Sequence, residues 1–387
     1  MPVSVVFENI FDGTVYAAKK ERRKPPKARR TQTMTKKVGA EFIKAQEALG
    51  EDLPDRALSI LENLLRREEL RDFEKAQITR LQAYVWAEKD DYPKAMIYLQ
   101  RAFSYNALQP QDQLDLQYQI AQLHLALDKW KEGEVLLTQW FEDAEALGSP
   151  PGPSAHALLA QIYLYFASDE KKDSPEEAQF YRKAEPHAQI AVFRATEPRE
   201  NWYQLYLSVL LFDDRYEEAV PILEAMVYRF PEKKNYYRQL AALYAELRRE
   251  KDSFQIQQIM HNKGMLEKHD ELLRISQLYL YYDIPFKAAI IMEKELEDGR
   301  IKDEEKYWEQ LANAWLSSRE WRKAIPPLQK AAEMSEDGEL FLRLGQTFMQ
   351  EEEWENAENY IKYAIKKGDL DNPGRAWLLL GITRNKK

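Results

Sequence analysis

A pattern that is written twice between residues 305 and 369 constrains the fold of this chain more than any other feature. Each copy contains two apolar faces with helical spacing. On each face, large apolar residues flank a small one. The first copy consists of Trp308, Leu311, Ala312 and Trp315, followed by Trp321, Ala324, Leu328 and Ala331. The second copy consists of Phe341, Leu344, Gly345 and Phe348, followed by Trp354, Ala357, Ile361 and Ala364. Two helices that pack closely on each other need this alternation of large and small residues.

The small residues predict where the two helix axes approach. Ala312 and Ala324 form one such pair, and Gly345 and Ala357 form the equivalent pair in the second copy. The offsets resemble those of the tetratricopeptide repeat (TPR), a helix–turn–helix unit of about 34 residues. The resemblance implies an all-α superhelical solenoid.

The same offsets can be traced back along the chain. The expected repeats begin near Val38, Ala76, Leu114, Pro153, Glu200, Lys234, His269, Glu305 and Gly338, and a final helix begins near Gly374. The further pairs of small residues are Ala83/Ala95, Ala121/Gly133, Ala160/Ala184, Ala241/Ser253 and Ser276/Ala288. Glycine is scarce, at 13 of 387 residues, which favours helix. The sequence therefore predicts about nine helical repeats followed by one more helix.

Turn residues divide the predicted solenoid. The segment 147–153 is a Pro/Gly cluster between the third and fourth repeats, and we place a soft boundary near Gly152. An insert at 168–179 lengthens the fourth repeat, and we expect it to form an exposed loop or a helix extension. The predicted organisation is an N-terminal segment at 1–37, a first group of repeats at 38–152 and a second group at 153–387.

The N-terminal segment differs from the rest of the chain. Residues 1–18 allow two interpretations, a disordered tail or the remnant of a signal peptide, since 15–17 resembles a cleavage site with small residues. Residues 19–37 contain ten Lys or Arg and one Glu. Such an arm either remains solvated or binds anionic lipid, nucleic acid or an acidic partner. The net charge of −9 for the whole chain argues against a general nucleic-acid binder.

Motifs for chemistry are scarce. The five histidines are scattered, none has a second ligand three or four residues away, and cysteine is absent, so we expect no metal or cofactor. His124 and His156 fall on packing positions and are expected to be buried structural histidines. We expect no enzyme activity. The alternative, an enzyme, would require a deep polar pocket, for which the joint at 148–153 is the best place. No apolar run reaches the roughly 18 residues that span a membrane.

The predicted first helices line the concave side of such a solenoid, where a partner peptide would lie. Amides recur at the ninth repeat position, and Tyr, Arg or Glu stand at the fifth and thirteenth. The candidate binding residues are Tyr118, Gln122, Gln161, Tyr165, Arg238, Gln277, Tyr281, Glu309, Asn313 and Gln346. Amides donate and accept hydrogen bonds at once, which suits a peptide backbone. The alternative is that glutamine is an ordinary exposed helix former.

The sequences at the repeat joints carry a narrower resemblance. They lie at 264–268, 283–289, 297–301, 335–340 and 368–377, and the segment 29–32 near the N-terminus adds to the resemblance. With these joints the chain resembles, over residues 29–381, the TPR proteins that are encoded beside TonB–ExbB–ExbD systems of Gram-negative bacteria. The resemblance implies a periplasmic accessory protein of TonB-dependent uptake that works through protein contacts. The alternative is a cytoplasmic scaffold whose basic arm anchors it to a membrane surface or nucleic acid.

Overall fold

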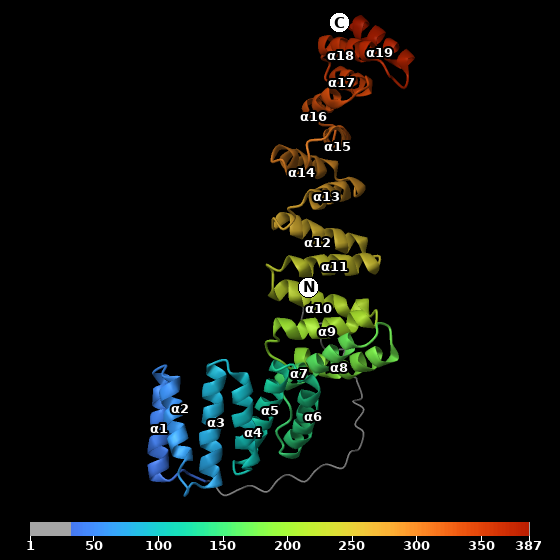
Figure 1. Cartoon of the computed structure of the whole chain (residues 1–387). Helices are drawn as coiled ribbons and strands as arrows, with labels where there is room; N and C mark the ends of the chain where they lie inside the picture. The colour runs from blue at the N-terminus through green and yellow to red at the C-terminus, as the bar shows by residue number, and fades with distance from the viewer. Residues whose placement is uncertain (1–31, 387) are drawn as a thin grey trace. The chain divides into compact units, whose positions relative to one another are not determined.

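Nineteen α-helices make up residues 32–386, which the computed structural model describes. The chain divides into two units, Met1–Asp213 and Asp214–Lys387. The first unit contains α1 (Lys36–Gly50), α2 (Pro54–Leu65), α3 (Asp72–Glu88), α4 (Tyr92–Ser104), α5 (Pro110–Ala126), α6 (Trp130–Ala146), α7 (Pro153–Asp169), α8 (Pro175–Phe193) and α9 (Glu200–Phe212) (Figure 1). The second unit contains α10 (Tyr216–Arg229), α11 (Lys234–Glu246), α12 (Glu250–Asn262), α13 (His269–Tyr281), α14 (Pro285–Glu297), α15 (Glu305–Ser317), α16 (Trp321–Met334), α17 (Glu339–Gln350), α18 (Trp354–Lys367) and α19 (Pro373–Lys386) (Figure 1).

The helices pair in the order of the sequence. Within each unit, a helix packs on the next one along the chain, and α1 also touches α3, α7 touches α9, and α17 touches α19. The predicted repeat starts at Pro153, Glu200, Lys234, His269 and Glu305 are the first residues of α7, α9, α11, α13 and α15. The other predicted starts lie within four residues of a helix start. The predicted all-α arrangement of about nine TPR-type helix pairs and a final helix is confirmed.

The two irregular joints lie within the first unit. Gly152, where the sequence places a soft boundary, directly precedes α7. The insert at 168–179 becomes the end of α7, a short turn and the first residues of α8, which at 19 residues is the longest helix described. The insert is therefore mostly a helix extension.

A left-handed residue follows a first helix in eight turns of the described chain. It is never glycine, and its φ angle lies between 53° and 59°. These residues are Asp52, Asp90, Asp128, Asp214, Arg248, Asp283, Arg319 and Glu352. In most of these turns the N–H of the next residue donates back across the turn, as from Arg249 to the carbonyl of Tyr244 at 2.7 Å and from Glu353 to that of Phe348 at 2.9 Å. This bond caps the helix and reverses the chain.

The predicted pairs of small residues lie where the helices cross. All of them are buried. The hydroxyl of Ser253 donates across the crossing to the carbonyl oxygen of Ala241 at 2.7 Å. A Cβ atom on Gly345 would lie 2.6 Å from Cγ1 of Ile361 and 3.3 Å from the carbonyl oxygen of Ala357. The absence of a side chain at Gly345 is thus a condition for the packing of α18 on α17.

None of the helices in residues 32–386 is both long enough and apolar enough to cross a membrane.

Two glycines at equivalent repeat positions make a matched test of the helix crossing. Gly345 lies in α17 against α18, whereas a Cβ atom on Gly381 of α19 would meet nothing within 4 Å. Alanine raises helix propensity equally at both sites, but only Gly345→Ala overpacks a crossing. We expect Gly345→Ala to be less stable than Gly381→Ala by about 1–3 kcal/mol in urea unfolding. Equal stability of the two variants would contradict a close crossing of α17 and α18.

Candidate interaction groove

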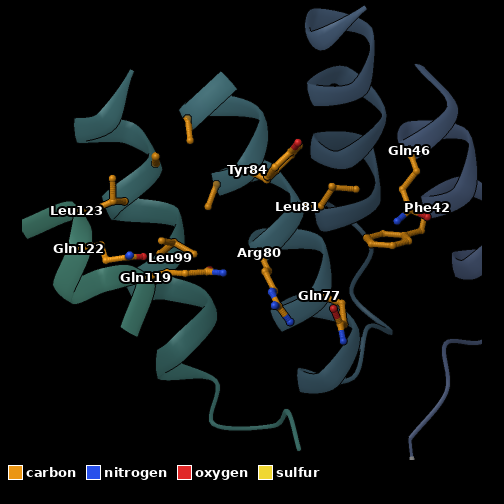
Figure 2. A pocket seen from close by; sticks show the side chains of 13 residues that line it. Phe42, Gln46, Gln77, Arg80, Leu81, Tyr84, Leu99, Gln119, Gln122 and Leu123 are labelled. Carbon is orange, nitrogen blue, oxygen red and sulfur yellow. The ribbon is translucent and has the colours of Figure 1, made fainter. Parts of the chain in front are cut away.

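A groove runs over three consecutive first helices of the first unit. It has a volume of about 480 Å³, which lies in the range of pockets that hold small ligands. Its walls come from α1, α3 and α5, and α4 adds Ala95 and Leu99 (Figure 2). We call it the α1–α3–α5 groove. The lining residues are Phe42, Gln46, Gln77, Arg80, Leu81, Ala83, Tyr84, Ala87, Ala95, Leu99, Gln119, Gln122 and Leu123.

Four side-chain amides line this groove. In Figure 2, Gln46 lies beyond Leu81 on one side, and Gln119 and Gln122 lie on the other. Gln77 comes from the α3 helix between them. Gln46 and Gln122 are exposed, and Gln77 and Gln119 are half-buried. No hydrogen bond within residues 32–386 engages these four amides, so each still has donor and acceptor atoms for a ligand.

One cation and one tyrosine lie among the amides. Arg80 of α3 donates to the carboxylate of Asp112 in α5 at 3.3 Å, which ties two repeats together and orients the guanidinium. Tyr84 is 54% exposed, and a hydrogen bond to Glu88 raises the pKa of its hydroxyl. The groove therefore combines amides, one guanidinium and a partly exposed ring above a floor of Leu and Ala.

The candidate residues of the first unit fall into two places. Gln122 lines the groove. Tyr118, also in α5, packs on Trp140 with ring centroids 4.8 Å apart, and burial raises its pKa, although the positive charge of Arg199 acts in the opposite direction. Tyr165 of α7 stacks on Trp130 at 4.0 Å, and Gln161 is exposed on the same helix. Neither α7 residue lines the groove.

In the second unit, Arg238 is part of an ion-pair cluster between repeats. Arg238 and Lys234 of α11 both donate to the carboxylate of Glu271 in α13, Lys234 at 2.9 Å. Burial acts to raise the pKa of Glu271. Hydrogen bonds from Arg238, Lys234 and two backbone N–H groups outweigh it and lower this pKa to about 2. The guanidinium of Arg238 therefore already has a partner within the chain.

Glu309 and Asn313 of α15 share one partner. Arg343 of α17 donates to the Glu309 carboxylate at 2.6 Å and to the side-chain oxygen of Asn313. Gln346, on the same helix as Arg343, is half-buried. Gln277 is exposed on α13, and Tyr281 is 72% exposed with its ring against the edge of Tyr282. The second-unit candidates thus include both engaged and open side chains.

The sequence reasoning missed five polar residues of the groove, which are Gln46, Gln77, Arg80, Tyr84 and Gln119. Gln46 and Tyr84 stand at the ninth position of the first and second repeats, if these are counted from Val38 and Ala76. Gln77 and Arg80 stand at the second and fifth positions of the second repeat. The same counting that identified Gln122 would have found these four residues. Gln119 stands at the sixth position of the third repeat, outside the positions that were counted.

Comparisons with known proteins return helical-repeat structures. No protein-family model and no curated protein sequence matches the chain. The crystal structure of a tetratricopeptide repeat protein from Parabacteroides merdae is 13% identical and covers 81% of this chain and all of its own, with a TM-score of 0.41. A Podosopora anserina putative kinesin light chain with nearly identical TPR-like repeats is 14% identical and covers 55% of this chain and 97% of its own, with a TM-score of 0.35. Both alignments are loose, so the assignment of the fold rests on the helix pairs described above.

Two histidines pair inside the fourth repeat. The Nδ1 atoms of His156 in α7 and His187 in α8 are 2.9 Å apart, so one imidazole donates to the other. The ring of Phe141 meets both imidazoles edge-on. Burial lowers the pKa of both histidines to about 4, and the positive charge of Arg194 adds to this effect at His156. His124 is also buried. Within residues 32–386, no cluster of three or more His, Cys, Asp or Glu is arranged to hold a metal ion.

The histidine pair predicts a pH dependence of stability. The ordinary pKa of histidine is 6.5, and burial lowers it to about 4 for both rings. Between these values the unfolded chain binds more protons than the folded chain, so the free energy of unfolding falls as the pH decreases from about 6.5 to 4. We expect a lower melting temperature at pH 5 than at pH 7.5. The double variant His156→Phe/His187→Phe should show a smaller drop, and an unchanged drop would contradict the assignment.

Proposed function

We propose that the α1–α3–α5 groove binds an extended segment of a partner protein and that the chain serves as a protein-interaction scaffold. The observation that carries this proposal is a set of four amides on three consecutive first helices that have no hydrogen-bond partner within residues 32–386. No internal hydrogen bond has to be broken before these amides bind a ligand. The fold supports the proposal because stacked helix pairs offer a long surface on which a partner can lie.

The chemistry of the groove fits a peptide backbone. Almost every residue of an extended peptide presents an N–H donor and a carbonyl acceptor. A glutamine side chain can accept from the first with its oxygen and donate to the second with its NH2 group. The apolar floor, which includes Leu81, Leu99 and Leu123, suits an apolar side chain of the partner. Phe42 and Tyr84 add aromatic area, which is enriched in protein interfaces.

The single cation sets an expectation for charge. Arg80 faces the groove, and one carboxylate, that of Asp112, already pairs with it. A guanidinium has five N–H donors, so Arg80 retains donors for a carbonyl group of the ligand. We therefore expect neutral segments to bind better than strongly basic ones.

Selection of binding peptides from a random displayed library tests the proposal. The selected peptide is measured against the wild-type chain and against the triple variant Gln77→Ala/Gln119→Ala/Gln122→Ala. A neutral hydrogen bond contributes about 0.5–1.5 kcal/mol net. We expect the triple variant to bind at least about tenfold more weakly, which corresponds to 1.4 kcal/mol.

The matched control replaces three exposed amides on second helices of the same unit. It is the variant Asn63→Ala/Gln100→Ala/Gln179→Ala, with changes on α2, α4 and α8. The control should bind as the wild type does, and circular dichroism should show equal helicity for all three proteins. Binding lost in the control and kept in the groove variant would place the binding surface on the second helices and overturn the proposal.

The narrower role, a periplasmic accessory component of a TonB-dependent uptake system, remains a proposal that is supported by the resemblance of the joint sequences. The basic arm of the alternative scaffold lies at 19–37, and its residues up to Thr31 are outside the part of the chain that the structure describes. Fractionation of cells that carry the native gene separates the two proposals. Protein in the periplasm supports the uptake role, and protein confined to the cytoplasm favours the anchored scaffold.

A further inference from the structure

A second groove lies between two second helices of the second unit. It has a volume of about 380 Å³, and α11 forms its floor between α10 and α12 (Figure 1). We call it the α10–α12 groove. The lining residues are Glu224, Val227, Tyr228, Pro231, Tyr237, Leu240, Tyr244, Ile256 and Ile259. The lining is therefore aromatic and aliphatic, with one carboxylate.

The rim of the α10–α12 groove is apolar where the equivalent rim two repeats later is charged. Tyr228 is 87% exposed and Ile259 is 41% exposed. At the same repeat positions, 69 and 71 residues later, α14 and α16 carry Glu297 and Lys330. Lys330 lies over the ring of Trp308, 4.1 Å from its centroid, so a charged side chain of the chain itself covers that surface. No side chain of residues 32–386 covers Tyr228 in this way, as its exposure shows.

The polar atoms at the floor of the groove already have partners. The hydroxyl of Tyr237 donates to the carbonyl oxygen of Pro231 at 3.2 Å, and the hydroxyl of Tyr244 donates to Oε1 of Glu224 at 2.5 Å. Both tyrosine rings are buried. A peptide N–H group that is pressed against this floor would lose its water and find these acceptors occupied, which costs free energy.

A proline-rich segment avoids this cost. Proline has no backbone N–H, and a run of prolines forms the polyproline II helix, which has no internal hydrogen bonds and is ordered before it binds. Such segments dock in grooves that are lined by aromatic side chains. The hydroxyl of Tyr228 has no partner within residues 32–386, so it can donate to a carbonyl group of the segment.

The charge of the groove comes from Glu224. Its Oε1 atom accepts from Tyr244, whereas its Oε2 atom accepts no hydrogen bond and meets no cation within the described residues. Arg249 lies over the ring of Tyr244, 4.5 Å from the centroid, but its guanidinium donates to the carboxylate of Asp252 at 2.8 Å. One negative charge therefore remains at this end of the groove, and it favours a cation on the ligand.

We propose that the α10–α12 groove binds a proline-rich segment of a partner protein, with prolines against Tyr228 and Ile259 and an Arg or Lys beside Glu224. This inference goes beyond the α1–α3–α5 groove, whose open amides suit a peptide backbone that has N–H groups. The chain then carries two surfaces for different partner segments. One surface recognises backbone hydrogen-bonding groups, and the other recognises a segment that lacks N–H donors.

Synthetic peptides with blocked termini test the chemistry of the occupant. The probe is a fluorescent octaproline that ends in one arginine, and a second peptide ends in glutamine instead. The third peptide is the D-proline form of the probe, which has the same composition and charge but the opposite helix hand. We expect the full chain to bind the probe saturably and the glutamine peptide about threefold more weakly, as for a partly exposed ion pair. The D-proline peptide should not bind.

Variants of the chain locate the binding. Tyr228→Ser removes the exposed ring, and Tyr281→Ser, at an exposed tyrosine of α13, is the matched control. Glu224→Gln removes the charge and keeps an oxygen for the hydroxyl of Tyr244. We expect Tyr228→Ser to bind the probe at least about tenfold more weakly and Tyr281→Ser to bind it as the wild type does. Glu224→Gln should bind the arginine and glutamine peptides equally. Thermal melting of both tyrosine variants should be unchanged, because both rings are exposed.

Four outcomes would overturn the proposal. One is no saturable binding of the probe by the wild type, and another is equal binding by the wild type and Tyr228→Ser. The third is loss of the probe in Gln77→Ala/Gln119→Ala/Gln122→Ala, which would place it in the α1–α3–α5 groove. The fourth concerns a peptide of residues 22–30, which holds two prolines among basic residues. If it binds more tightly than the probe and Tyr228→Ser abolishes its binding, the groove belongs to the chain's own basic arm.

Discussion

A reversal of the chain at one left-handed residue sets the geometry of almost every helix pair. In seven turns within the two units this residue has a φ angle between 55° and 59°, its side chain is exposed and the following N–H closes the end of the first helix. The two helices then run antiparallel, and positions 12 residues apart face each other, as Ala241 and Ser253 do. The α7–α8 pair has a longer turn, and its small residues, Ala160 and Ala184, stand 24 positions apart. The length of the turn therefore determines which two residues meet where the helices cross.

The sequence predicted the helix pairs well because the information is local. A small residue and its aromatic neighbours lie within one turn of helix of each other, so Ala312 and Trp315 identify a packing face without knowledge of the rest. The left-handed residues were not predicted, since Asp, Arg and Glu at this position do not signal a positive φ as glycine does.

The site was predicted less completely for a different reason. The repeat positions indicated which side chains lie on the surface that the first helices form, and Gln122 was identified in this way. Whether such a side chain is open or engaged depends on a residue one repeat away. Arg343 occupies Glu309 and Asn313, and Glu271 occupies Arg238, across 30 to 34 residues. The candidate residues of the second unit are consequently mixed, since Arg238, Glu309 and Asn313 have partners within the chain whereas Gln277 is exposed.

The packing of each helix on its neighbours in the sequence affects the rate of folding. Within each unit, helices touch their neighbours in the sequence, so the average sequence separation of contacting residues is small. Chains with such low contact order need little loop closure before contacts form, and they fold fast. Because each helix pair touches only the pairs beside it, one pair can open and expose its amide hydrogens while the rest of the unit stays folded. Local unfolding within each unit can therefore stop after one helix pair has opened.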